Sequence, residues 1–290
     1  MIVILLATYP KCGNSALSFP LVLAGQLADS SYTGYDNLYK ARLAHLRDNA
    51  LPFKAIPGQE TTIIKTHNIF KQPSDLITPQ GEVSKVIRII RNPFDCLLSA
   101  LNFLRLEAKN SNNLAKIKPT IDTLFPHCKI IRRWTSPKRF AKIFTLDNLA
   151  KENLLDMALQ SFSQSGLTLP FYYSVCGGWI SNFESWSAAS VPTLSLRYED
   201  LTPSPSAETI HSIAEFVKTD RELLAKAFEY QLENVNQQKS SGSLFFNKAS
   251  KDYYLNYFTA KAVNQFIDYN QIAIQRLGYE ELITHIRGLD

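Results

Sequence analysis

The N-terminal stretch constrains the fold of this chain more than any other feature. An apolar run, Ile2–Ala7, is followed by Tyr9-Pro10-Lys11-Cys12-Gly13-Asn14-Ser15, and a helical pattern then covers Ala16–Leu27. This order predicts a buried strand, a loop and a helix. The first amides of a helix lack intrahelical partners and carry the positive end of its dipole, so the loop is suited to bind an anion. Lys11 adds a full positive charge.

The loop differs from the Walker phosphate loop of nucleotide triphosphatases. That loop needs a glycine, four further residues and then Gly-Lys-Ser/Thr, whereas Lys11 precedes Gly13, the only glycine here. The residues leave two interpretations open. The stretch is a phosphate loop of another kind, or an ordinary strand-to-helix turn in which Asn14 or Ser15 caps the helix.

Further strands predict an α/β fold with a central parallel sheet in three layers. Apolar runs predict strands at Thr61–Lys65, Val86–Ile90 and Thr193–Arg197, and each run ends at polar or charged residues. Ligands of an open parallel sheet bind at the carboxyl ends of its strands. We therefore expect a P-loop-like strand-loop-helix unit whose binding site includes the other strand ends.

The remaining segments predict helices and one domain. Helical patterns cover Tyr35–Asn49 (ended by Pro52), Pro93–Leu106, Tyr173–Ala188, the stretch after Pro203 and Pro205, Glu222–Leu232 and Ala260–Leu277, with a loop expected at Asn234–Ser243. A length of 290 residues with 45% apolar composition suits one domain over 1–290. We expect a helical insertion or lid on the acceptor side at about 109–166.

The charge distribution argues against a general nucleic-acid binder. The formal net charge is only +5, from 31 Lys+Arg and 26 Asp+Glu. The positive excess is concentrated in Lys116, Lys118, Lys129, Arg132, Arg133, Lys138, Arg139 and Lys142, among which Asp122 is the only acid. This basic segment is either a solvated face or an electrostatic funnel for an anionic ligand, such as an acidic acceptor.

The cysteines and the N-terminus predict a cytoplasmic protein. Cys12, Cys96, Cys128 and Cys176 show no CxxC spacing, so we expect reduced thiols. The N-terminal apolar run is too short for a signal-peptide core or a membrane span, so no integral membrane association is expected. Cys12 lies beside Lys11 at a helix N-terminus, which predicts a reactive thiol that bound nucleotide protects.

Five segments carry motifs in a fixed order. They are Tyr9–Ser15, Ile64–His67, Lys85–Ser99, Gly177–Trp179 and Leu196–Leu201. Together they resemble the sulfotransferases that use 3′-phosphoadenosine 5′-phosphosulfate (PAPS). The first segment is similar to the family's YPKSGT loop and the second to its IKTH segment, and Arg91 and Ser99 are eight residues apart, as in the family.

The resemblance implies a role for individual residues. Lys11, the amides of Cys12, Gly13, Asn14 and Ser15, and the Ser15 hydroxyl would hold the 5′-phosphosulfate. Arg91 and Ser99 would hold the 3′-phosphate, and Tyr198 would lie near the adenine. The family's last phosphate loop, RKG, falls on Asn247, Lys248 and Ala249, of which only the lysine is kept, and Ala16 stands where the family commonly has a tryptophan beside the adenine.

The residue types suit sulfuryl transfer. An acceptor hydroxyl must lose a proton as it attacks sulfur, and His67 is the only one of five histidines that follows such a strand, so it is the candidate general base. The others (His45, His127, His211 and His285) are expected to be structural. Lys11 and Lys65 can neutralise charge on the leaving phosphate oxygen. The alternatives are that His67 only caps a turn and that Arg91 pairs with Asp95 or Glu199.

The sequence therefore predicts a PAPS-dependent sulfotransferase that releases adenosine 3′,5′-bisphosphate (PAP). No carboxylate stands at Arg91-Asn92-Pro93, where a metal-dependent phosphotransferase would often place one, so metal-free transfer is expected. A P-loop-like nucleotide kinase and a catalytically inactive nucleotide-binding homologue are the alternatives. The expected acceptor is a hydroxyl-bearing small molecule, lipid or glycan. Aromatic residues form either its pocket or ordinary core: Phe103, Trp134, Phe171, Tyr172 and Tyr173.

Overall fold

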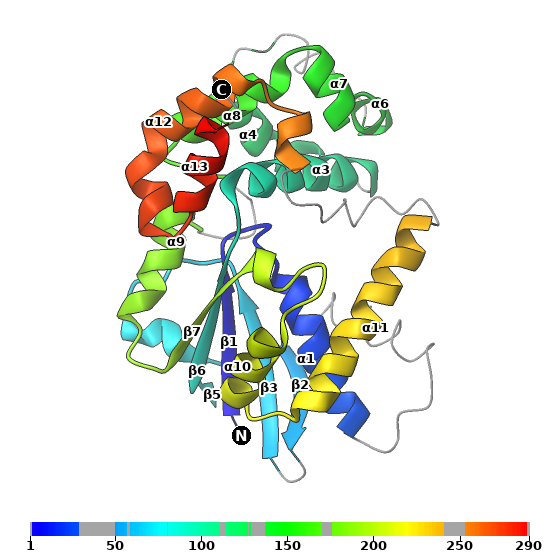
Figure 1. Cartoon of the computed structure of the whole chain (residues 1–290), viewed down its shortest axis with the longest axis vertical. Helices are drawn as coiled ribbons and strands as arrows, with labels where there is room; N and C mark the ends of the chain where they lie inside the picture. The colour runs from blue at the N-terminus through cyan, green and yellow to red at the C-terminus, as the bar shows by residue number, and fades with distance from the viewer. Residues whose placement is uncertain are drawn as a thin grey trace. The chain divides into compact units, whose positions relative to one another are not determined.

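The computed structural model describes residues 2–28, 50–56, 59–79, 81–110, 114–126, 128, 137–169, 176–240 and 253–288. The chain divides into two compact units, each built from two stretches: Met1–Arg91 with Phe183–Ala249, and Asn92–Asn182 with Ser250–Asp290. The first unit contains the five-stranded sheet and the second contains helices (Figure 1). The prediction of one domain over 1–290 stays a prediction.

The sheet of the first unit has the strand order β2-β3-β1-β6-β7. The bounds are β1 Ile2–Thr8, β2 Ala50–Ile56, β3 Gln59–Thr66, β6 Lys85–Ile90 and β7 Thr193–Arg197. The pairs β1–β3, β1–β6 and β6–β7 are parallel, which confirms the predicted α/β fold with a central parallel sheet. The strand β2 was not predicted; it contains Pro52 and pairs antiparallel with β3 at the edge, where proline is tolerated.

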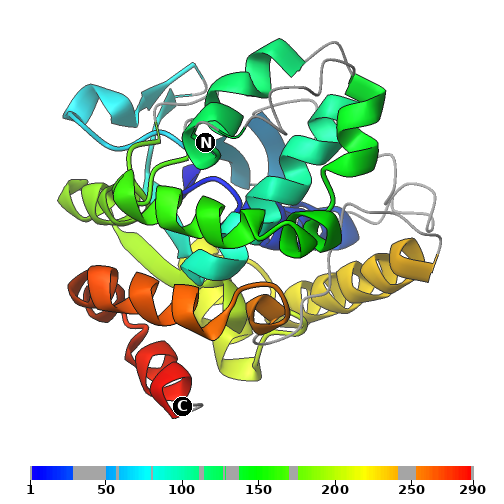
Figure 2. The ribbon, with the colours of Figure 1, turned by 90° about the horizontal axis from the view of Figure 1, so that it is seen from above.

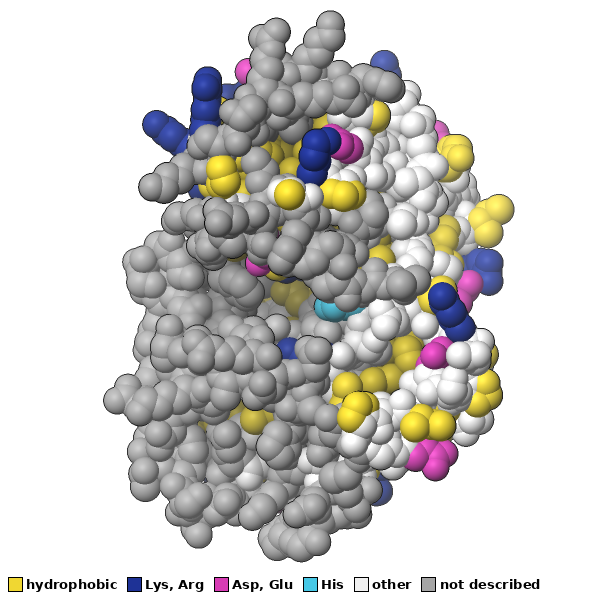
Figure 3. Space-filling model, turned by 180° about the vertical axis from the view of Figure 1, so that it is seen from behind, with side chains coloured by type: hydrophobic (Ala, Val, Ile, Leu, Met, Phe, Trp, Pro, Cys, Tyr) yellow, Lys and Arg dark blue, Asp and Glu magenta, His cyan; other side chains and the backbone are white. Residues whose placement is uncertain are grey.

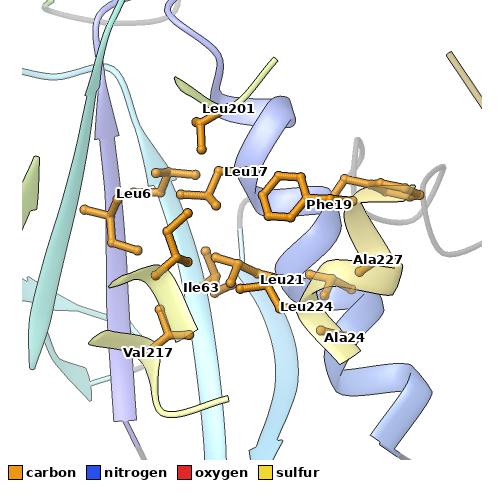
Figure 4. Close-up of a cluster of buried hydrophobic side chains, with 14 of the residues drawn as sticks. Leu6, Leu17, Phe19, Leu21, Ala24, Ile63, Leu201, Val217, Leu224 and Ala227 are labelled. Carbon is orange, nitrogen blue, oxygen red and sulfur yellow. The ribbon is translucent and has the colours of Figure 1, made fainter. Parts of the chain in front are cut away.

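Alternate residues of β1 enter two different cores. Ile4 and Leu6 pack with residues of α1 (Asn14–Ala28), α10 (Ala207–Val217) and α11 (Arg221–Ser240), as Figure 4 shows for Leu6. Val3 and Leu5 face the other way and pack with Trp186 and other buried side chains. Because both faces are buried, β1 reads as a continuous apolar run. Each such side chain contributes about 1.5–3 kcal/mol of burial free energy.

A proline inside α1 removes one helical hydrogen bond, and a side chain of α11 supplies the missing donor. Pro20 has no backbone N–H, so the carbonyl of Ala16, four residues earlier, lacks its usual helical donor. The Gln231 side-chain amide of α11 donates to this carbonyl at 3.2 Å. The bond ties α11 to the first turns of α1, immediately after the loop.

The second unit packs around aromatic residues. Its helices include α3 (Pro93–Asn110), α4 (Leu114–Leu124), α6 (Pro137–Ile143), α7 (Leu146–Lys151), α8 (Leu154–Gln164), α12 (Ala260–Arg276) and α13 (Glu280–Arg287). The Phe94 ring stacks on Tyr254, with centroids 4.8 Å apart, and tilts against Phe266 at 4.7 Å. α12 lies beside α8 (Figure 2), and the Asp156 carboxylate of α8 accepts hydrogen bonds from the N-cap residue Thr259.

Several helix predictions need correction. α11 continues to Ser240, so the loop expected at Asn234–Ser243 is wrong for residues 234–240. α9 spans only Trp179–Ser185, and α13 was not predicted. The helix expected over Tyr35–Asn49 lies outside the described residues. None of the helices in the described part of the chain is long and apolar enough to cross a membrane.

Candidate active site

The loop after β1 makes a tight turn before α1 begins at Asn14. Lys11 has φ +71° and Gly13 has φ +106°, both in the region that side-chain-bearing residues rarely adopt. The Cys12 amide donates to the Tyr9 carbonyl at 3.1 Å, and the Ala16 amide donates to the Gly13 carbonyl at 2.9 Å. These bonds fix the shape of the loop from within.

Three consecutive amides are left for a ligand. The N–H groups of Gly13, Asn14 and Ser15 donate no hydrogen bond to any acceptor in the part of the chain that the structure describes. Because α1 begins at Asn14, these groups are the first amides of a helix, which suits an anion. The buried Asn14 Oδ1 accepts no hydrogen bond there either, so the alternative of Asn14 as an ordinary helix cap lacks its defining bond.

Tyr198 and Arg91 lie against this loop. A Cβ atom at Gly13 would stand only 2.4 Å from Cδ2 of the Tyr198 ring, so the ring packs directly on the glycine backbone. The Arg91 guanidinium lies over the same ring, with its carbon 4.1 Å from the centroid. Arg91 Nη1 also donates to the Lys11 carbonyl at 3.2 Å. The ends of β6 and β7 therefore both contact the loop after β1.

His67 follows β3 and is held by the end of β1. The register pairs Ala7 with Thr66, which brings Thr8 beside His67. Nδ1 of His67 lies 2.8 Å from the Thr8 carbonyl oxygen and 3.2 Å from Thr8 Oγ1. A carbonyl can only accept, so Nδ1 carries the proton and Nε2 keeps its lone pair. This tautomer leaves Nε2 able to take a proton from a substrate.

The charge state of His67 follows from its surroundings. Burial and the charges of Lys11 and Lys65 lower the pKa of His67 to about 4, although the bond to Thr8 opposes the shift. Burial also lowers the pKa of Lys65. The imidazole is therefore neutral at neutral pH, which is the form that a general base requires.

The other predicted site residues lie on helices, in the loop after β1 or outside the described residues. Ser99 is half-buried on α3, in the second unit. Asn247, Lys248 and Ala249 lie outside the described residues, as do His45 and His127. His211 and His285 are exposed on α10 and α13. The side chain of Cys12 is fully buried, which argues against the reactive thiol that its position suggested.

The basic segment is described only in part. Lys118 forms a salt bridge with Asp122 one helical turn away, and Arg139 and Lys142 are exposed. Lys129, Arg132 and Arg133 lie outside the described residues, as do Trp134, Phe171, Tyr172 and Tyr173. On the face in Figure 3, the described Lys and Arg side chains stand in separate groups. Among the described residues, no cluster of His, Cys, Asp and Glu could hold a metal ion.

Two contributors were not found by sequence reasoning. The Thr8 carbonyl orients His67, and the Gln231 amide supports α1 just behind the loop. Aligning the ends of β1 and β3 could have found Thr8, because their carboxyl ends meet at one edge of a parallel sheet. Gln231 belongs to no motif, so the sequence around it offers no comparable signal.

Comparisons with known proteins identify the fold and the family of this chain. A comparison with curated protein sequences gives no match. Among solved structures, the fold is similar to that of a mouse sulfotransferase complexed with PAP, with a TM-score of 0.52 and 17% identity, over 100% of this chain and 89% of the mouse chain. The family model "Sulfotransferase domain" matches residues 2–279. This match spans nearly the whole chain, which therefore belongs to the sulfotransferase family.

Proposed function

We propose that this chain transfers the sulfuryl group of PAPS to a hydroxyl group of an acceptor and releases PAP. The observation that carries the proposal is the orientation of His67, whose Nδ1–H is bound to the Thr8 carbonyl while Nε2 keeps its lone pair. A base prepared in this way beside an anion-binding loop suits the removal of a hydroxyl proton. That the similar mouse enzyme was solved with PAP supports the choice of donor.

The residues at the loop fit the donor's two anionic ends. The unused amides of Gly13, Asn14 and Ser15, together with Lys11 and the Ser15 hydroxyl, would hold the 5′-phosphosulfate. The Cys12 amide already donates to the Tyr9 carbonyl within the loop. We therefore remove Cys12 from the expected backbone donors and keep Gly13, Asn14 and Ser15. Arg91 would hold the 3′-phosphate with Ser99 and the Asn247–Ala249 segment, and Tyr198 would lie near the adenine.

The reaction needs one proton transfer from the acceptor. Bound PAPS supplies an activated sulfuryl group and a phosphate leaving group. His67 Nε2 takes the acceptor's hydroxyl proton as that oxygen bonds to sulfur and the bond from sulfur to the bridging phosphate oxygen breaks. Lys11 and Lys65 stabilise the negative charge that develops on the phosphate. No metal ion enters this scheme.

The lowered pKa of His67 is consistent with this role. In the free protein, burial and the positive charges of Lys11 and Lys65 disfavour the imidazolium. An anionic donor bound at the loop would offset those charges, so the pKa of His67 should rise when the donor is bound. The base would thus become stronger in the complex in which it is needed.

The acceptor would bind beside the insertion that follows α3. We assign acceptor contacts to the insertion at about 109–166, and the acceptor to hydroxyl-bearing small molecules, lipids or glycans. The basic segment within it would favour an acidic acceptor. Neutralising Arg132, Arg133 and Arg139 together should then raise the acceptor KM, and an unchanged KM would argue against this assignment.

The test of the proposal is calorimetric titration with PAP in Mg²⁺-free buffer. We expect binding that Arg91→Ala weakens by about 1.5–3 kcal/mol, the range of charge-assisted hydrogen bonds. PAPS should then be consumed with a panel of phenolic, aliphatic and glycan hydroxyl compounds. His67→Gln should bind PAP like the unmodified protein and lose about 10²–10⁴-fold in turnover. Absent PAP binding, or a Mg²⁺ requirement for transfer, would contradict the proposal.

A further inference from the structure

We propose that Arg91 and Tyr198 act as a pair that couples the two phosphate subsites, because the pair sets the shape of the loop that receives the 5′-phosphosulfate. In this role Tyr198 is a positioning residue. The inference rests on the proposed function, since it concerns how the same nucleotide is held.

The first contact is between Tyr198 and the loop backbone. The Tyr198 ring lies so close to Gly13 that an added Cβ would come within 2.4 Å of Cδ2 and 3.1 Å of Cε2. The ring therefore fills the space beside the glycine whose amide is one of the three unused donors. A smaller side chain at position 198 would let this segment move.

The second contact joins Arg91 to both the Tyr198 ring and the loop backbone. The guanidinium carbon lies over the Tyr198 ring, 4.1 Å from the centroid, which is favourable for a cation and an aromatic face. The same guanidinium donates from Nη1 to the Lys11 carbonyl at 3.2 Å. Arg91 thus fixes the ring and the loop to each other.

The loop conformation makes this support necessary. Lys11 has φ +71°, and such a conformation in a residue other than glycine persists only where its surroundings hold it. The hydrogen bond from Arg91 is made to the carbonyl of this residue. If the bond and the ring were lost, Lys11 could relax and the amides of Gly13 and Asn14 would turn away from the anion.

Coupling between the subsites follows from this arrangement. Arg91 is also the candidate ligand of the 3′-phosphate, so an anion bound there holds the guanidinium in place. A guanidinium held in place keeps the Lys11 carbonyl and the Tyr198 ring in place as well. The 5′-phosphate should then contribute more to affinity when the pair is intact.

The test compares PAP with adenosine 3′-phosphate, which lacks only the 5′-phosphate. The ratio of their dissociation constants gives the contribution of the 5′-phosphate, because contacts to the adenine and the 3′-phosphate cancel. In Tyr198→Leu, which changes no charge, we expect this ratio to fall about tenfold, the effect of about 1.4 kcal/mol. Tyr198→Phe keeps the ring face and should keep the ratio. Arg91→Lys keeps the charge but removes the guanidinium that contacts both the ring and the Lys11 carbonyl, and it should lower the ratio as Tyr198→Leu does.

The outcomes separate the possible roles. If Tyr198 only contacts the adenine, both nucleotides weaken equally in Tyr198→Leu and the inference is wrong. If Tyr198 only stabilises the fold, the thermal midpoint falls while the ratio in the folded protein holds, which also overturns it. Should Tyr198→Leu not fold, an unchanged ratio in Arg91→Lys would overturn it alone. A parent protein that binds neither nucleotide would instead refute the proposed function.

Discussion

At the scale of single residues, Gly13 illustrates how narrow the choices in the loop are. Its φ of +106° disfavours any side chain, and the Tyr198 ring leaves no room for a Cβ. We expect Gly13→Ala to weaken PAP binding at least about tenfold, because the loop must shift to relieve a contact of 2.4 Å. Titration calorimetry measures the loss.

Gly166 provides a matched control for this substitution. It also has a positive φ, +65°, but a Cβ there would meet nothing within 4 Å. Gly166→Ala should therefore cost about 1 kcal/mol of stability through backbone strain alone and leave PAP affinity unchanged. Equal losses of affinity in both variants would show that backbone strain, and not the ring contact, is responsible.

His67 gives a prediction about pH. Its pKa in the free protein is about 4, so kcat/KM for PAPS, which reports the free enzyme, should rise with pH through that value. Between pH 5.5 and 8 it should show no histidine titration, because the base is already neutral. A limb with an apparent pKa near 6.5 in a pH–rate profile, absent from His67→Gln, would contradict the assignment.

The same histidine links stability to pH. An unfolded histidine titrates near 6.5, so between about pH 6.5 and 4 the unfolded state binds a proton that the folded state does not. Stability should therefore be complete above pH 6.5 and fall as the pH drops toward 4. Urea unfolding at pH 7.5 and 5 should show a larger loss in the parent protein than in His67→Gln; equal losses would count against the lowered pKa.

At the scale of elements, the contact between α1 and α11 can be tested by a double-mutant cycle. Gln231→Leu leaves the Ala16 carbonyl without a donor, so we expect it to lower the free energy of unfolding by about 1–3 kcal/mol. Pro20→Ala restores a backbone N–H that can reach this carbonyl. In the Pro20→Ala background Gln231→Leu should cost clearly less, as measured by urea denaturation. Equal costs in both backgrounds would refute the explanation.

The elements also show what sequence alone can predict. β1 and β6 were predicted because strands that are mostly buried on both faces are largely apolar. β7, in which only Leu196 is buried, was predicted from a short run with apolar residues that ends at charged ones. β2 was missed because Pro52 suggests the end of a helix, whereas an edge strand can contain it. The C-terminal part of α11 was missed because residues 234–240 are polar except for Val235 and lack a helical apolar period.

Some residues of the candidate site can be predicted from the sequence and others cannot. Lys11, His67 and Arg91 could be selected from sequence because chemically suitable side chains directly follow or end predicted strands. The Thr8 carbonyl could not, since every residue has a carbonyl and only the pairing of β1 with β3 singles this one out. The Gln231 contact joins residues 215 positions apart and depends on tertiary packing.

At the scale of the whole molecule, nucleotide binding should be visible in thermal unfolding. The prediction of one domain implies a single cooperative transition by scanning calorimetry. PAP at about 100 times its dissociation constant should add about 2.7 kcal/mol and raise the midpoint. Arg91→Ala should show a smaller shift at the same concentration. Two separate transitions, of which PAP moves only one, would contradict the one-domain prediction.

The pairing of β1 with β3 has a consequence for how this chemistry can be lost. The proton on His67 Nδ1 is assigned by a main-chain oxygen, which every substitution at position 8 retains. A substitution at position 8 can therefore weaken the site, but the proton stays on Nδ1 and the lone pair on Nε2. A one-residue deletion within Ile2–Thr8 or Gln59–Thr66 would instead shift the strands against each other and move the imidazole away from its partner. The backbone thus sets the orientation of the imidazole. Substitutions in β1 and β3 should disturb this orientation less than insertions or deletions do.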